Sequence, residues 1–158
     1  MPGFDYRGQY AYHLTLVSES RSHRFEVAAA AQACVDLLHR AAAHCRSAVL
    51  AYSVMPDHVH LLVQGEAEDS DLRSFVKLFK QLTGYHLKTT PRAPVWQRSY
   101  HDRVLWDEAE INEVVAYIVR NAATEGLTAA YERHRWTGGV YVEAVLSGST
   151  FVAFKTPT

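Results

Sequence analysis

Apolar residues recur along this chain with two periods, which predict two kinds of element. Strand-like alternation or short apolar runs occupy four segments, residues 9–18, 49–55, 58–63 and 95–106. Helix-like apolar spacing or helix-favouring composition occupies three longer segments, residues 27–45, 71–88 and 107–126. The order predicts an α+β fold on the ferredoxin-like plan, β-α-β-β-α-β, with an antiparallel sheet, helices on one face and an added C-terminal helix.

The added helix has clear end signals. Asp107 is suited to cap its first turn with Glu110 three residues later, and Gly126 is suited to end it. Beyond it, the pattern predicts a short helix near residues 129–134 and apolar alternation over residues 140–154. The length of 158 residues fits one domain over residues 1–158, with a core over about 10–127 and a C-terminal extension over about 128–158.

Composition excludes some classes of protein. No apolar run of 18 residues predicts a membrane span, and residues 1–5 lack the pattern of a signal peptide. Cys34 and Cys45 are expected on one helix about 16 Å apart, too far for a disulfide, so we expect free thiols and a cytoplasmic location. The formal net charge of −1 gives no overall support for nucleic-acid binding.

The local charge distribution differs from the total. No Asp or Glu lies between Asp71 and Asp102, and six cations fall between them: Arg73, Lys77, Lys80, Lys88, Arg92 and Arg98. Such a segment can contact phosphates although the whole chain is nearly neutral, or it can be an ordinary solvated helix face. Charge alone leaves both interpretations open.

Two histidines lie two positions apart in the third expected strand. Because side chains alternate along a strand, His58 and His60 face the same side, with Cα atoms about 6–7 Å apart. Two imidazoles at that spacing can bind one metal ion, although most such pairs are structural or face solvent. Asp57 is expected to be a turn residue whose carboxylate points away from the pair.

A tyrosine and an asparagine share one flank of the late helix. Tyr117 and Asn121 are one turn apart, about 40° around the axis. Taken alone, such a tyrosine is most simply explained as a ring packed at the surface with its hydroxyl in water. Its meaning changes when it is considered together with the histidine pair.

Four sequence motifs together resemble one known family. Residues 54–63 (VMPDHVHLLV) resemble the histidine–hydrophobic–histidine motif of the single-tyrosine HUH transposases, and residues 79–83 (FKQLT) resemble its basic-helix motif. Residues 96–105 (WQRSYHDRVL) are similar to the tryptophan-led strand of the REP-associated branch, and residues 117–121 (YIVRN) lie where that branch has its nucleophile helix. The resemblance covers about residues 10–127. The chain departs from it where Ala122, rather than proline, follows Asn121, and in the C-terminal region, which is represented weakly, by Trp136 at most.

The resemblance implies a DNA strand transferase. Tyr117 is then the nucleophile that forms a 5′-phosphotyrosine, and His58, His60 and Asn121 are the metal ligands. The implied cofactor is Mg²⁺ or Mn²⁺, although imidazole ligands alone would equally suit Zn²⁺. The implied partner is single-stranded or hairpin DNA, and our candidates for phosphate contacts are Lys77, Lys80, Arg92 and Arg98. Relatives act as monomers or as a homodimer, so the oligomeric state stays open.

Two other functions remain as alternatives. The first is a hairpin-DNA-binding module on the same fold that is catalytically idle or domesticated. The second is a metal hydrolase or nucleotide hydrolase of the kind that uses three alternating histidines, but Leu62 occupies the third position here. Covalent attachment of single-stranded DNA would separate these alternatives from a transposase.

Overall fold

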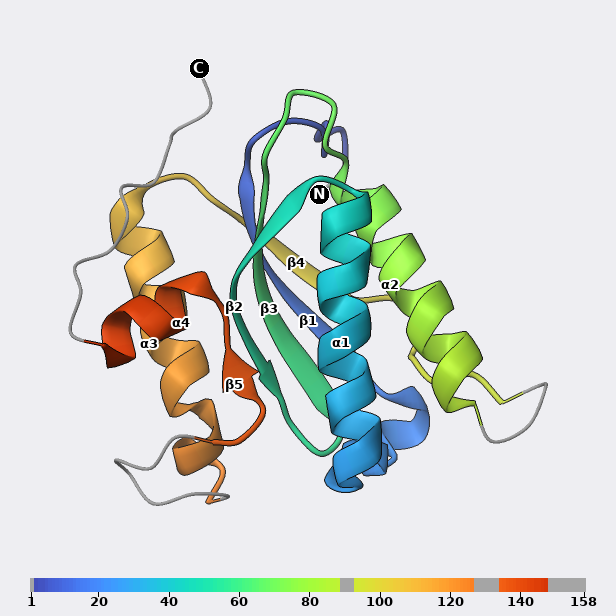
Figure 1. The fold of residues 1–158 in the computed structure, drawn as a ribbon. Coiled ribbons are helices and arrows are strands. Elements are labelled where there is room, and N and C mark those ends of the chain that lie inside the picture. Colours follow the sequence, from blue (N-terminus) through green and yellow to red (C-terminus); the bar gives the residue numbers. More distant parts are fainter. Residues whose placement is uncertain (1, 89–92, 127–133, 148–158) are drawn as a thin grey trace.

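The computed structural model describes residues 2–88, 93–126 and 134–147. Five antiparallel strands form one sheet in the order β4-β1-β3-β2-β5, so β1 and β3 lie side by side in its middle (Figure 1). The strands are Ala11–Val17 (β1), Ser47–Val54 (β2), His58–Gly65 (β3), His101–Leu105 (β4) and Thr137–Gly138 (β5). The helices are Ala28–His44 (α1), Leu72–Leu87 (α2), Glu108–Thr124 (α3) and Val140–Leu146 (α4). The order and pairing of β1 to β4 confirm the ferredoxin-like plan.

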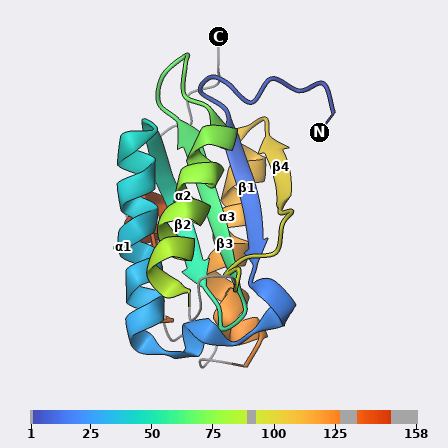
Figure 2. The same cartoon turned by 90° about the vertical axis from the view of Figure 1, so that its right-hand side faces the viewer.

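Helices cover both faces of the sheet. The side chains of Leu14 and Leu61 belong to the same buried cluster as Phe75 and Phe79 of α2. A second buried cluster brings together Leu62 of β3 with residues of α3 and α4, including Ile118. Figures 1 and 2 show α1 and α2 on one side of the sheet and α3 on the other. The prediction of helices on one face therefore holds for α1 and α2, whereas the added helix α3 lies on the opposite face.

The fourth strand is shorter than the sequence predicted. Residues 95–106 were expected to be extended throughout, but β4 begins only at His101. The preceding segment is irregular and is anchored to other elements instead. The indole of Trp96 donates a hydrogen bond of 2.7 Å to the Thr83 hydroxyl, and the amide of Gln97 donates to the Val17 carbonyl at 2.9 Å. The indole contact and an isolated antiparallel bridge between Ser18 and Trp96, rather than a regular strand, hold this segment in place.

The C-terminal region departs most from prediction. Residues 140–146 form the helix α4 instead of an alternating segment, and residues 148–154 lie outside the described residues. The short helix expected near residues 129–134 lies outside them too, apart from His134, which is not helical. The two-residue strand β5, which was not predicted, pairs with β2 at Tyr52 and Ser53. In the described parts of the chain, no helix is long and apolar enough to span a membrane.

Candidate functional site

The two motif histidines lie on the central strand β3, on the face of the sheet that α3 covers. His58 begins β3 and His60 follows two residues later, so their side chains share this face. The strand register places Thr15 of β1 opposite His60, which brings residues of β1 to the same place. The two rings lie with centroids 4.9 Å apart, and both residues are buried. The alternation read from the sequence therefore describes this pair correctly.

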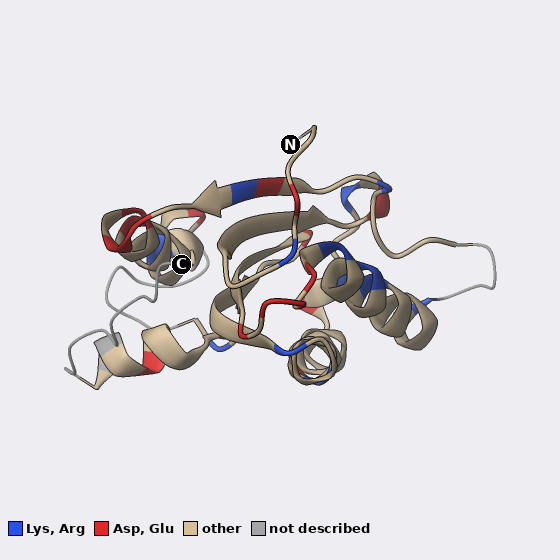
Figure 3. Ribbon diagram, turned by 90° about the horizontal axis from the view of Figure 1, so that it is seen from above, with Lys and Arg blue, Asp and Glu red and all other residues tan. Residues whose placement is uncertain are grey.

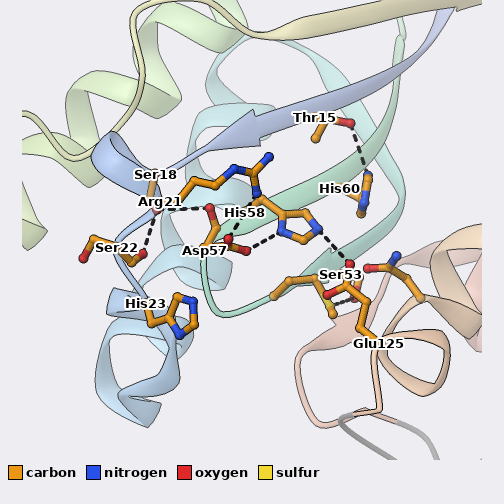
Figure 4. Close-up of polar contacts among 12 residues, drawn as sticks. Thr15, Ser18, Arg21, Ser22, His23, Ser53, Asp57, His58, His60 and Glu125 are labelled. Atoms are coloured by element: carbon orange, nitrogen blue, oxygen red, sulfur yellow. Dashed lines mark hydrogen bonds and ion pairs between the residues drawn. The ribbon is translucent and has the colours of Figure 1, made fainter.

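Asp57 fixes the orientation of His58. The Nδ1 atom of His58 lies 2.7 Å from Oδ1 of Asp57, and Arg21 donates a hydrogen bond of 3.1 Å to the other carboxylate oxygen (Figure 4). Burial by itself would raise the pKa of Asp57, but the hydrogen bonds from His58 and Arg21 outweigh it and lower that pKa below its ordinary value. The prediction that this carboxylate points away was wrong, because an adjacent side chain at the strand start can fold back onto the ring.

His60 is held by two residues of β1. Its Nδ1 atom lies 3.2 Å from the Thr15 hydroxyl and 3.3 Å from Nε2 of His13. Burial, followed by the neighbouring charges of His58 and His13, lowers the pKa of His60 to about 3. Burial and the nearby Arg103 lower the pKa of His13 to about 4. Both rings are therefore neutral at pH 7, and neutral imidazole is the form that binds metal ions.

His13 is a site residue that the sequence analysis missed. The expected first strand had Tyr12 and Leu14 on the core side, so the same alternation places His13 on the opposite side. The alternation thus indicates which face His13 occupies. Whether His13 reaches the motif histidines depends on the pairing of β1 with β3, which the sequence alone does not establish. The structure shows that pairing and puts the His13 ring 5.4 Å from the His60 ring.

Helix α3 and the residue that caps its C-terminus present a row of three polar side chains to the histidines. Tyr117, Asn121 and Glu125 follow one another at intervals of four residues, so they lie along one side of the helix. The Tyr117 ring packs edge-on against His60 at 5.2 Å and against His13 at 6.0 Å. At the other end, a carboxylate oxygen of Glu125 lies 3.7 Å from Nε2 of His58. Asn121 stands between them, with its amide nitrogen 3.4 Å from the Tyr117 hydroxyl.

The donor atoms of this site are compatible with a bound divalent metal. The contacts of His58 with Asp57 and of His60 with Thr15 and His13 both use Nδ1, as is usual when the Nε2 atoms face a metal. The Oδ1 atom of Asn121 is buried and accepts no hydrogen bond among the described residues, so an oxygen donor stands free. No cluster of three His, Cys, Asp or Glu side chains in metal-binding geometry occurs among the described residues. The candidate set therefore depends on the amide oxygen.

Comparisons with known proteins identify the family. The family model for IS200-like transposases matches residues 7–121, which include both histidines, Tyr117 and Asn121. The chain belongs to the IS200-like transposase family. No curated protein matches the chain significantly.

Two solved structures are similar to this family member. One is a REP-associated tyrosine transposase bound to a REP hairpin, with a TM-score of 0.68 and 16% identity over 81% of this chain and 74% of that one. The other is a candidate transposase of Deinococcus radiodurans R1, with a TM-score of 0.51 and 26% identity over 82% of this chain and 98% of that one. The first likeness shows that the two proteins share a fold.

The three described cations among the four predicted DNA contacts, Lys77, Lys80 and Arg98, do not lie together with the Tyr117 site. Lys77 is exposed on α2, and Arg98 is exposed on the segment that α2 holds. Lys80 is only partly exposed, because its ammonium group donates hydrogen bonds to the carbonyls of Gln97 and Arg98. Arg92 lies outside the described residues. In this IS200-like transposase, α2 therefore presents its positive charge on the face of the sheet opposite to the histidines.

Proposed function

We propose that this IS200-like transposase is a metal-dependent strand transferase of the HUH type that cleaves single-stranded DNA through a 5′-phosphotyrosine. Tyr117 is the nucleophile, and the chemistry takes place on the face of the sheet that α3 covers. Membership of the family indicates a DNA-processing enzyme; the reaction and the residues that carry it out are what we add.

One observation carries this proposal. The hydroxyl-bearing ring of Tyr117 lies against His60 and His13, and Asn121 reaches the hydroxyl from the next turn of the same helix. Tyr117 is 46% exposed, so a DNA backbone can reach its oxygen. A tyrosine whose ring merely packs at the surface is not expected to lie beside a cluster of buried histidines.

The reaction exchanges one phosphate ester for another. The phenolic oxygen of Tyr117 attacks the scissile phosphorus, the bond from phosphorus to the 3′-oxygen breaks, and that oxygen takes up a proton to leave a free 3′-hydroxyl. The phosphotyrosine retains an activated ester, so the 3′-hydroxyl of another strand can attack it and restore Tyr117 without ATP. The phenol must lose its own proton, which at pH 7 costs about 4 kcal/mol for a group with an ordinary pKa near 10.

Asn121 serves two purposes in this scheme. Its amide nitrogen donates to the Tyr117 oxygen, and a donor at that distance stabilises the negative charge that develops there. Its free Oδ1 joins the Nε2 atoms of His58 and His60 as the third donor of the candidate metal site. Mg²⁺ or Mn²⁺ bound by these residues would polarise the scissile phosphate and stabilise the leaving 3′-oxygen.

All these groups belong to one chain. Because Tyr117 lies beside the histidines of its own chain, the cleavage step does not require a second subunit. A homodimer stays a prediction from the sequence, and its function would be to bring two DNA ends together. The substrate that we propose is single-stranded DNA adjoining a hairpin, in keeping with the similar transposase whose structure contains a REP hairpin.

A covalent-attachment assay tests the proposal. The protein is incubated with Mn²⁺ and a 3′-end-labelled oligonucleotide that carries a hairpin with single-stranded flanks, and the products are separated on a denaturing gel. We expect a labelled protein band that disappears in Tyr117→Phe. A protein that shifts DNA in a native gel but never becomes labelled would be an idle binding module, and a small-nucleotide hydrolase would do neither.

A further inference from the structure

A groove lies between the C-terminal half of α2 and residues 93–95, away from Tyr117. It is open to solvent, measures about 370 Å³, and is lined by Lys80, Gln81, Gly84, Tyr85, Lys88 and Ala93 to Val95. None of these side chains is acidic. Its location on the α2 side separates it from the histidine site, which lies on the other face of the sheet (Figure 2).

Tyr85 is the most unusual side chain of this groove. It is 79% exposed, more than any other large apolar or aromatic side chain among the described residues. The ammonium group of Lys88 lies 5.3 Å from the centre of its ring, so the cation and the aromatic surface stand next to each other. An aromatic ring held open to solvent beside a cation is the arrangement on which proteins stack an unpaired base and bind its phosphate.

The charge around the groove points to the same ligand. Lys77, Lys88 and Arg98 form no ion pair with any described residue, whereas Arg21, Arg46 and Arg103 do. Lys80 uses two of its three ammonium protons on the carbonyls of Gln97 and Arg98, which leaves one proton for a ligand. The lysines and arginines of α2, blue in Figure 3, have no acidic residue as a neighbour on that helix. An anionic ligand would find cations here that are not already neutralised.

The geometry points to a second DNA-binding subsite in this groove, where one unpaired base stacks on Tyr85 while the adjacent phosphates contact Lys88 and Lys80. The identity of the ligand, single-stranded DNA, rests on the proposed function, whereas the location of the subsite does not. The subsite binds a nucleotide of the single-stranded flank or loop, because a base within a duplex has no free face to stack on the ring. It contributes to affinity and takes no part in the reaction at Tyr117.

Two substitutions at Tyr85 test the stacking. Binding of a fluorescent hairpin with a single-stranded tail is measured by anisotropy, with chelator present so that no cleavage occurs. Tyr85→Ala is expected to raise the Kd about 5- to 150-fold, whereas Tyr85→Phe, which keeps the ring, is expected to stay within twofold of wild type. Arg40→Ala, an exposed α1 substitution, is the surface-charge control and is expected to change nothing. A blunt duplex of the same length is expected to bind equally to all four proteins.

Lys88→Ala tests the phosphate contact, and a cleavage assay tests whether the subsite affects binding alone. Lys88→Ala is expected to reduce the salt dependence of single-strand binding by about 0.7 in the log–log slope. Tyr85→Ala is expected to raise the DNA concentration needed for half-maximal cleavage and to leave the rate at saturating DNA unchanged. Unchanged affinity in Tyr85→Ala, with wild-type protein that still becomes labelled, would overturn the subsite alone. Wild-type protein that binds the tailed hairpin but never becomes labelled would instead overturn the proposed function.

Discussion

The amide nitrogen of Asn121 lies 3.4 Å from the phenolic oxygen of Tyr117, while the carbonyl oxygen of the same amide is buried without a hydrogen-bond partner among the described residues. One side chain thus connects the proposed nucleophile with the proposed metal ligands. This arrangement needs a helix, because only residues three or four apart meet along one helix side. It also explains why the amide is useful at this position, since a carboxylate could not donate a hydrogen bond to the phenol.

The first prediction concerns this amide. Asn121→Ala is expected to slow covalent attachment by about 10- to 150-fold, because a hydrogen bond to a developing charge is lost. Its effect on Mn²⁺ affinity, measured by titration calorimetry, is expected to be smaller than that of His58→Ala, since a neutral amide is the weakest of the three ligands. Asn112→Ala, a substitution earlier on α3 and outside the row that faces the histidines, is the control. Equal Mn²⁺ affinity in Asn121→Ala and wild type would remove Asn121 from the ligand set.

The second prediction concerns the nucleophile. Tyr117→Phe is expected to abolish labelling in the denaturing gel and to leave DNA affinity within twofold and unfolding free energy within about 0.5 kcal/mol, because only a half-exposed hydroxyl is removed. Tyr100 is a second tyrosine that stands next to a histidine in the sequence, but it packs against the core on the α2 side, with the Lys80 ammonium 5.4 Å from its ring. Tyr100→Phe is therefore the matched control that keeps labelling. The reverse result would show that the wrong tyrosine has been chosen.

The third prediction concerns Asp57. Its carboxylate orients His58 through Nδ1, and loss of such a partner typically weakens metal binding 10- to 100-fold. Asp57→Asn is expected to raise the Kd for Mn²⁺ by that factor, since the amide is a weaker acceptor for the ring. Asp36→Asn, on the exposed side of α1, is expected to have no effect. Unchanged Mn²⁺ affinity in Asp57→Asn would mean that His58 does not depend on this contact.

The sequence predicted the part of the site that depends on local periodicity. Alternation along one strand places His58 and His60 together, and helical spacing places Tyr117 and Asn121 together, so neither pair needs tertiary information. His13 and Thr15 could not be assigned in this way, because they reach His60 only through the pairing of β1 with β3. Asp57 was misjudged because its side chain folds back at a strand end, where alternation no longer applies.

The fold was predictable to a similar extent. The strand and helix order followed from pattern, but the face that α3 covers depends on how its apolar stripe meets Leu62 and Leu105 in three dimensions. The segment before His101 was predicted to be part of a strand, whereas anchors such as the hydrogen bond from Trp96 to Thr83 determine its irregular path. Such anchors leave no periodic trace in the sequence.

The fourth prediction concerns acid stability of the metal-free protein. Burial lowers the pKa of His13 to about 4 and that of His60 to about 3, whereas both are near 6.5 in an unfolded chain. Below about pH 6.5 the unfolded state therefore binds more protons than the folded state, and stability is lost as the pH falls towards 4. Two such groups give a slope of at most about 2.7 kcal/mol per pH unit.

Urea unfolding with chelator at pH 7 and pH 5 measures this effect. His13→Gln is expected to roughly halve the dependence of unfolding free energy on pH, because one of the two proton-binding sites is removed. His44→Gln, at the exposed end of α1, is the control and is expected to keep the wild-type slope. A wild-type protein equally stable at both pH values would show that the two rings are not buried in their neutral form.

The fifth prediction separates the cations of α2 and its neighbouring segment into two roles. Lys77 and Arg98 are exposed, so Lys77→Ala and Arg98→Ala are each expected to reduce the salt slope of single-strand binding by about 0.7 with little change in stability. Lys80 differs, because its ammonium group donates to the carbonyls of Gln97 and Arg98 at 2.9 and 3.1 Å. Lys80→Ala is therefore expected to lower the unfolding free energy by about 1–2 kcal/mol, a range reduced for partial exposure. Arg40→Ala serves as the common control for both measurements. If Lys80→Ala leaves the unfolding free energy unchanged, the ammonium group of Lys80 does not hold this segment.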